Sequence, residues 1–183
     1  FAHIIQKPDE RTKFYLFFYS SLQQIGKDTI LKVMQKLLHK TMFHSTGCVQ
    51  TIMPSQSGGS QFNSALDKKI FVQINEQKPE DIKKNQSEVK ECTTRDYNTI
   101  EVKFCSPYQQ RNYCRIAYCS NHKPPVASGE QRMVLFEADP SRKNDTAFWN
   151  HVYNDEFLQN PAVMSALRDY LQALDLTGFS SQD

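Results

Sequence analysis

The chain of 183 residues lacks any apolar run near the ~20 residues that a helix needs to cross a bilayer, so a transmembrane helix is excluded. It also lacks an excess of charge of one sign, because 22 Lys and Arg stand against 20 Asp and Glu, a net charge of +2. The chain as a whole is therefore neither a strongly basic nucleic-acid-binding protein nor an acidic tail. Any site for a polyanion must be local.

The five cysteines lack Cys-x-x-Cys spacing, and their number is odd. Neither a structural zinc site nor a secreted disulfide framework is predicted from such a set. We expect buried, reduced thiols, with Cys114 and Cys119 on opposite faces of one strand because they are five positions apart. Hydrophobic residues make up 39% of the chain, which is enough for a core and excludes a disordered chain.

Four apolar runs predict buried strands, over residues 14–19, 69–74, 113–119 and 133–136. The other expected elements are a short helix over 1–6, an amphipathic helix opened by Gly26, a loop over 55–61, a charged helix over 79–91, an exposed hairpin strand over 99–104 and helices after Asp145. This alternation is typical of an α/β fold with a mostly parallel central sheet. We expect one domain, with its core over 1–143 and a C-terminal helical segment over 144–183. Because the chain does not begin with Met, we expect it to be a piece of a longer polypeptide.

The loop over 21–29 follows a predicted buried strand and opens a helix, which is the context of a phosphate-binding loop. There, backbone N–H groups hold an anion and a lysine, here Lys27, reaches the terminal phosphates. The loop departs from the usual pattern, because Ser21 stands at the first glycine position and Asp28 displaces the expected hydroxyl to Thr29. A surface turn with a solvated lysine is the alternative interpretation.

Polar residues also end two other predicted strands. Asn75 and Glu76 stand where nucleoside triphosphatases place one carboxylate near Mg²⁺ and another near the attacking water. Glu76 can act as a general base, whereas Asn75 brings no charge. Asn121 can orient a water by donating and accepting together. The alternatives are an acid that merely ends a core strand and an ordinary turn asparagine.

Two further residues are candidates for a chemical role. Arg132, just before the fourth strand, is either a cation offered to a neighbouring subunit's phosphate or a charge on the rim. His122 has no Ser or Cys nucleophile pattern nearby, so we interpret it as a loop histidine.

In order and spacing, these elements resemble the superfamily 3 helicases, in particular the poxvirus- and phage-type primase-helicases. The resemblance covers nearly the whole chain, and its most specific match is the segment over 115–126. The other matching segments are 2–8, 26–29, 62–66, 75–76, 90–103 and 130–137. The chain departs from the family at four positions: Ser21 and Gln24 replace glycines of the loop, Asn75 replaces an aspartate, and Gln131 replaces an arginine. A side chain where the backbone needs φ > 0 costs ~1 kcal/mol or more.

The resemblance implies a P-loop NTPase of the AAA+ type, the ATP-dependent DNA helicase domain of a viral or mobile-element replication protein. It implies ATP and Mg²⁺ as cofactors, single-stranded DNA as partner, a homo-oligomeric hexameric ring, no membrane, and an intracellular site of viral replication in the host cytoplasm or nucleus. A catalytically impaired relative that acts as a nucleic-acid-binding or ring-scaffold module is the alternative. An unrelated globular domain is a third reading.

The resemblance also implies a role for individual residues. Lys27, Glu76, Asn121 and Arg132 would be catalytic, as phosphate ligand, base, γ-phosphate sensor and arginine from the next subunit. Ser21, Gln24, Gly26, Lys27, Asp28 and Thr29 would hold the nucleotide, and Thr29, Asn75 and Glu76 would position the metal. Lys103, at a hairpin tip, would contact DNA phosphates irrespective of base sequence.

Overall fold

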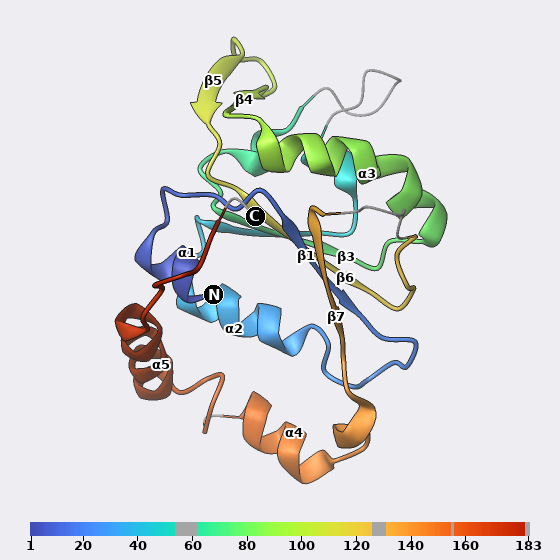
Figure 1. Cartoon of the computed structure of the whole chain (residues 1–183), viewed down its shortest axis with the longest axis vertical. Helices are drawn as coiled ribbons and strands as arrows, with labels where there is room; N and C mark the ends of the chain where they lie inside the picture. Colours follow the sequence, from blue (N-terminus) through green and yellow to red (C-terminus); the bar gives the residue numbers. More distant parts are fainter. Residues whose placement is uncertain (54–61, 126–130, 155, 182–183) are drawn as a thin grey trace.

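A parallel sheet of five strands forms the centre of the computed structural model, in the order β2-β3-β6-β1-β7 (Figure 1). The strands are β1 (Tyr15–Tyr19), β2 (Phe43–Thr46), β3 (Phe71–Asn75), β6 (Arg115–Ser120) and β7 (Met133–Glu137), and all four pairings are parallel. The predicted α/β fold with a parallel sheet is confirmed. The structure describes residues 1–53, 62–125, 131–154 and 156–181, so the loop predicted over 55–61 lies outside the described residues.

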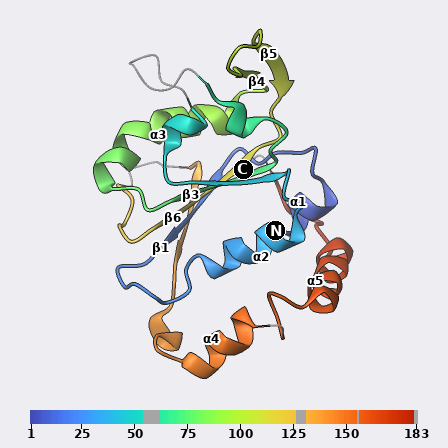
Figure 2. The ribbon, with the colours of Figure 1, turned by 180° about the vertical axis from the view of Figure 1, so that it is seen from behind.

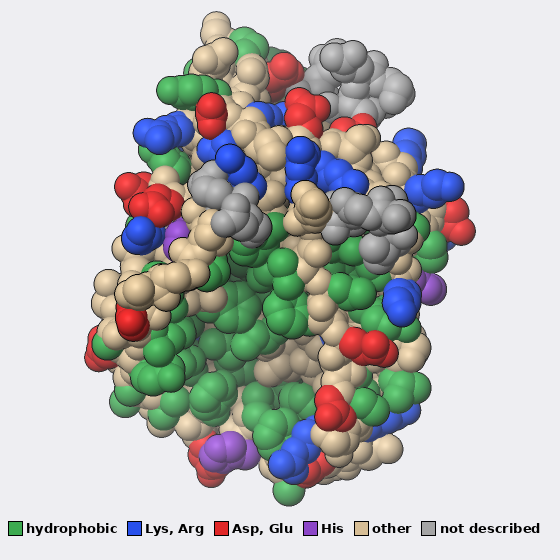
Figure 3. All heavy atoms as spheres, in the orientation of Figure 1, with side chains coloured by type: hydrophobic (Ala, Val, Ile, Leu, Met, Phe, Trp, Pro, Cys, Tyr) green, Lys and Arg blue, Asp and Glu red, His purple; other side chains and the backbone are tan. Residues whose placement is uncertain are grey.

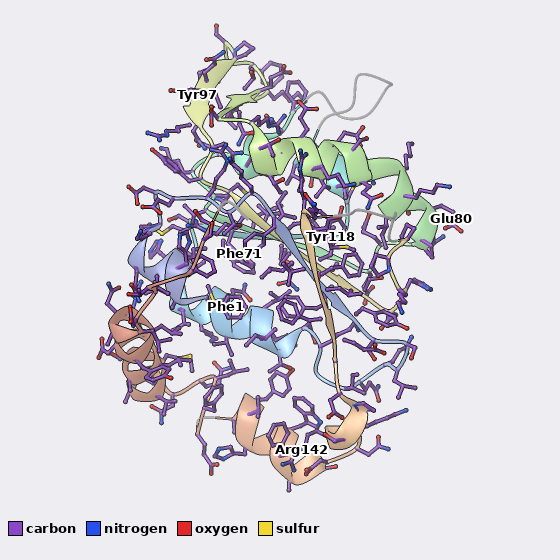
Figure 4. All side chains as sticks on the ribbon, in the orientation of Figure 1. Phe1, Phe71, Glu80, Tyr97, Tyr118 and Arg142 are labelled. Carbon is purple, nitrogen blue, oxygen red and sulfur yellow. The ribbon has the colours of Figure 1, made fainter. Side chains whose placement is uncertain are left out.

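Helices cover both faces of this sheet, which explains the continuous apolar runs (Figures 1 and 2). On one face α3 (Pro79–Thr94) contributes to a core cluster in which Phe17 and Tyr118 stack with ring centroids 5.3 Å apart. On the other face α1 (Ala2–Gln6) and α2 (Thr29–Leu37) contribute to a second cluster, which contains Phe71 (Figure 4).

The cysteines are only partly as expected. Cys114 belongs to the first cluster and Cys119 to the second, so they lie on opposite faces as predicted. Cys92 is also buried, but Cys48 and Cys105 are exposed thiols. Cys48 lies two residues after the end of β2, and Cys105 lies in the connection over 101–107, so both stand outside the strands of the central sheet.

Strand β2 was not predicted. Only Phe43 of its four residues is buried, and the three that follow are polar, so the sequence carries no apolar run there. The strand forms because its backbone pairs with β3 over four positions. Edge strands of this kind depend on a neighbour that the local sequence does not reveal.

The exposed hairpin is present as a separate two-stranded sheet, β4 (Tyr97–Ile100) with β5 (Tyr108–Arg111). It stands beyond α3, away from the main sheet (Figure 1). The first strand begins two residues before the predicted one, so Lys103 and Phe104 fall in the connecting turn rather than in a strand.

The tail forms α4 (Thr146–Tyr153) and α5 (Pro161–Ala173), and three short 3₁₀ helices complete the fold, η1 (Val49–Thr51), η2 (Ser64–Leu66) and η3 (Pro140–Arg142). Asp145 and Asn160 cap the two tail helices by accepting backbone N–H groups. Gln6 donates to the carbonyls of Leu171 and Leu174, both at 2.8 Å, and so fixes α5 to α1. No helix among the described residues is both long enough and apolar enough to span a membrane.

One face of the sheet is hollowed between α1, α2 and β7. The hollow has a volume of about 830 Å³, and its walls include Leu16, Phe18, Val134 and Phe136. Hydrophobic side chains gather there in the space-filling view (Figure 3). Strand β7 is accordingly apolar in sequence yet largely exposed.

Candidate functional site

The carboxyl ends of β1, β3 and β6 meet at one edge of the sheet, where a cavity of about 660 Å³ opens. Lys27 comes to its wall from the loop after β1, Asn75 and Glu76 from the end of β3, and Asn121 from the residue after β6. Parallel strands deliver the residues that follow them to the same edge, which is where ligands bind in open α/β sheets. Three residues far apart in the sequence, Lys27, Glu76 and Asn121, therefore line one cavity.

The loop between β1 and α2 passes through two left-handed residues, Gln24 with φ 61° and Gly26 with φ 77°. Gly26 is needed for this φ and also for space, because a Cβ atom there would lie 1.9 Å from the Trp149 ring. Gln24 adopts the same handedness with a side chain, at a cost of ~1 kcal/mol. The backbone at position 24 therefore adopts a conformation that favours glycine, although the residue there is glutamine.

Lys27 is half-buried in the cavity wall. The neighbouring Asp28 pairs with Lys32 on α2, with 3.2 Å between Oδ2 and Nζ. In the described part of the chain no carboxylate forms an ion pair with Lys27. Its ammonium is therefore available to an anionic ligand.

Asn75 is held by hydrogen bonds that link two neighbouring strands, β3 and β2. Gln73 Nε2 donates to Asn75 Oδ1 at 2.6 Å, and Asn75 Nδ2 donates to Ser45 Oγ at 2.8 Å. Both ends of the Asn75 amide are engaged, so this side chain is poorly placed to give an oxygen to a cation. One sign of these hydrogen bonds is visible in the sequence, because Gln73 is a polar residue inside an apolar strand.

Glu76 leaves β3 with φ 52°, and its N–H donates to the Cys119 carbonyl at 2.9 Å. A left-handed conformation at a residue with a side chain costs of order 1–3 kcal/mol, and such strain concentrates at functional sites. The Glu76 side chain is exposed and lines the cavity.

Two buried groups complete the wall between β3 and β6. Asn121 Oδ1 is buried and has no hydrogen-bond partner within the described residues. Such an acceptor costs about 1–3 kcal/mol unless a ligand or water satisfies it. Burial raises the pKa of the Cys119 thiol to about 11, so this group is protonated at neutral pH and is no nucleophile.

Five predicted site residues do not line this cavity. Gly26 belongs to the loop beside it but lines the neighbouring cavities instead. Ser21 precedes the part of the loop that lines the cavity, and the Thr29 hydroxyl lies 2.6 Å from that of Tyr153. Arg132 precedes β7, so it stands at the opposite, amino-end edge of the sheet, where its carbonyl accepts the Tyr15 N–H. Lys103 is in the hairpin turn.

The side chains at the cavity do not supply enough ligands to bind a metal ion by themselves. The described residues contain no group of three or more His, Cys, Asp or Glu that could hold a metal ion. Mg²⁺ at phosphate sites usually takes one or two protein carboxylates and completes its shell with phosphate oxygens and water. Glu76 fits that limited role, and the cavity suits a cation that arrives with a phosphate ligand.

A family model matches residues 18–133, from β1 to the start of β7, and its description is "Family of unknown function (DUF5906)". The chain belongs to this family. The DUF5906 match includes every cavity residue named above. No curated protein sequence matches the chain.

Solved structures share the fold of this DUF5906 domain. The apo C-terminal region of NrS-1 superposes with a TM-score of 0.76 at 20% identity, over 95% of this chain and 40% of that chain. A second apo form of that region gives 0.75 at 22% identity, over 95% and 40%. JCV helicase, solved with a bound acetamide compound, gives 0.57 at 10% identity, over 98% and 52%. The chain thus spans about half or less of these neighbours.

Proposed function

We propose that this DUF5906 domain binds ATP with Mg²⁺ in the cavity beside Lys27 and hydrolyses it as the motor of a DNA helicase. The observation that carries the proposal is the meeting of Lys27, Glu76 and Asn121 at the carboxyl edge of a parallel sheet. The fold that the domain shares with JCV helicase supports a helicase-like role.

Each of the three groups has a distinct task in phosphoryl transfer. The Lys27 ammonium neutralises charge on the terminal phosphates, and Glu76 accepts a proton from the attacking water. Asn121 orients that water through its unsatisfied Oδ1. Mg²⁺, when bound, would neutralise developing phosphate charge, and Glu76 would hold it through a coordinated water, which leaves the carboxylate able to accept the proton.

Arg132 acts on a neighbouring copy. It stands at the opposite edge of the sheet from the cavity, too far around the molecule to serve its own site. An arginine supplied by the next subunit stabilises transition-state charge, which is worth ~10³-fold or more in rate. This arrangement favours a ring of copies, as in a hexamer.

The hairpin is the surface for single-stranded DNA. The Lys103 Nζ lies 5.0 Å from the centre of the Phe104 ring, and Phe104 is 94% exposed. A cation for phosphates beside an exposed aromatic ring for bases is the usual combination in proteins that bind single strands. Lys103→Ala should weaken binding to single-stranded DNA and flatten its salt dependence, measured by fluorescence anisotropy.

A second candidate function is a nucleotide- or nucleic-acid-binding scaffold that does not hydrolyse ATP. It is favoured by the engaged amide of Asn75, which leaves one carboxylate at the end of β3, and by the strained Gln24 in the loop.

ATP binding by calorimetry and ATP turnover, each with and without single-stranded DNA, separate the two. We expect binding and turnover in the native domain and loss of both in Lys27→Ala, with no loss in Lys40→Ala, an exposed lysine outside the cavity. Turnover that survives Lys27→Ala rules out this site. Binding without turnover selects the scaffold, and absence of binding refutes both nucleotide roles.

A further inference from the structure

A second cavity, of about 400 Å³, adjoins the first. The two share Gln24 and Asp28 of the loop after β1, so one stretch of backbone separates them. The far wall of the second cavity is α4, which contributes Trp149, Asn150 and Tyr153. A volume of this size lies within the ~300–1,000 Å³ range of small-molecule sites.

Two aromatic rings in this wall are held in place by hydrogen bonds. The Trp149 indole N–H donates to the Arg142 carbonyl at 2.7 Å, and the Tyr153 hydroxyl lies 2.6 Å from Thr29 Oγ1. Their ring centroids are 6.0 Å apart with 30° between the planes. A fixed, flat aromatic surface of this kind suits a flat heteroaromatic ligand, which loses little entropy in stacking on it.

Polar groups surround the rings. Asn144 and Asn150 line the cavity with exposed side-chain amides, and no hydrogen bond to either amide occurs within the described residues. A primary amide offers both a donor and an acceptor, which is what the edge of a nucleobase requires.

The position of Trp149 against the phosphate loop links the two cavities. Its ring lies so close to Gly26 that a Cβ atom there would be 1.9 Å from ring carbon Cη2. The aromatic wall therefore lies directly against the loop that carries Lys27, beside the first cavity.

We propose that the cavity between the loop and α4 is a nucleobase subsite, in which a purine lies against Trp149 and its edge meets the amides of Asn144 and Asn150. The inference rests on the proposed binding of a nucleoside triphosphate and adds the part of the ligand that is recognised. A purine is favoured because its two fused rings cover more of the indole than a pyrimidine does.

The chain contains a single tryptophan, so its fluorescence reports on this wall alone. The domain is titrated, with Mg²⁺ present, with ATP, CTP and inorganic tripolyphosphate, and affinities are measured in parallel by calorimetry. We expect ATP to change the Trp149 emission, CTP to bind less tightly, and tripolyphosphate to bind without the change.

Two variants test the contact directly. Trp149→Ala should weaken ATP binding on the order of tenfold, because stacking on one base is worth ~1–3 kcal/mol. Asn150→Ala, at an exposed position that spares the fold, should also weaken ATP binding alone, whereas the adjacent His151→Ala should not.

The outcomes distinguish this inference from the function on which it rests. Equal binding of ATP and tripolyphosphate, with both variants unaffected, overturns the base subsite and leaves a phosphate site at Lys27. Equal binding of ATP and CTP overturns the preference for a purine. Failure of ATP and tripolyphosphate alike to bind overturns the proposed function itself.

Discussion

Polar groups at the amino-end edge of the central sheet differ from those at the carboxyl-end edge in how far hydrogen-bond partners surround them. At the amino-end edge, the buried Arg115 donates to the carbonyls of Lys7, Pro8, Glu10 and Tyr113. At the carboxyl-end edge, Gln24 and Glu76 are strained and Asn121 Oδ1 has no partner in the part of the chain that the structure describes. The two terminal nitrogens of the Arg115 guanidinium are enclosed by carbonyl partners, and only its Nε has none among the described residues, whereas the groups at the cavity are left ready for a ligand.

The largest expected effect concerns the enclosed edge. Burial lowers the pKa of Arg115 to about 10, so the guanidinium is still charged at neutral pH and joins the segment before β1 to β6. Arg115→Met leaves several buried carbonyls without a donor and should lower the free energy of unfolding by about 3 kcal/mol or more, measured by urea denaturation. The exposed Arg142→Met, on the tail (Figure 4), should cost under about 1 kcal/mol. Equal losses of unfolding free energy in the two variants would contradict the structural role assigned to Arg115.

The next largest effect is a loss of ATP turnover at unchanged stability. Glu76→Gln removes the proposed base but keeps the size of the side chain, so turnover of ATP should fall by ~10²-fold or more while the urea midpoint stays within error. Glu80→Gln, on the exposed start of α3 (Figure 4), is the matched control and should leave turnover intact. A Glu76→Gln domain of native activity would remove Glu76 from the mechanism.

A smaller effect tests the strain itself. Glu76→Gly should stabilise the domain by about 1 kcal/mol, since glycine adopts φ 52° without a steric penalty, and should abolish turnover. Lys68→Gly, at φ 56° outside the cavity, should bring a similar gain with turnover preserved. Thermal unfolding and ATP turnover are measured on both. If Glu76→Gly destabilises the domain, the strain at this residue has been misjudged.

The smallest effect is a dependence on pH at the enclosed edge. Burial and the nearby Arg115 lower the pKa of His3, so the unfolded chain binds more protons than the folded one below about pH 6.5. Stability should therefore fall slightly as the pH falls through this range. Burial and Lys69 lower the pKa of His44 too, so the slope should shrink in His3→Gln and shrink further in His3→Gln with His44→Gln. An identical slope in the native domain and both variants would contradict this account.

The comparison also explains what the sequence could predict. Strands β1, β3 and β6 are apolar on both faces, so their runs are visible in the sequence, and the polar residues that follow them, together with the family resemblance, indicate Lys27, Glu76 and Asn121. Strand β2 was missed because one buried residue leaves no pattern. The contact of Gly26 with Trp149 was missed for a different reason, since it joins segments that only packing brings together.

The placement of Arg132 and Glu76 at opposite ends of parallel strands constrains any assembly that uses both. A two-fold symmetric pair can meet this requirement only where the copies lie side by side with their strands antiparallel, because each arginine then lies at the other copy's carboxylate end. Head-to-tail association offers the arginine in one direction only, and it either closes into a cycle or continues as a filament.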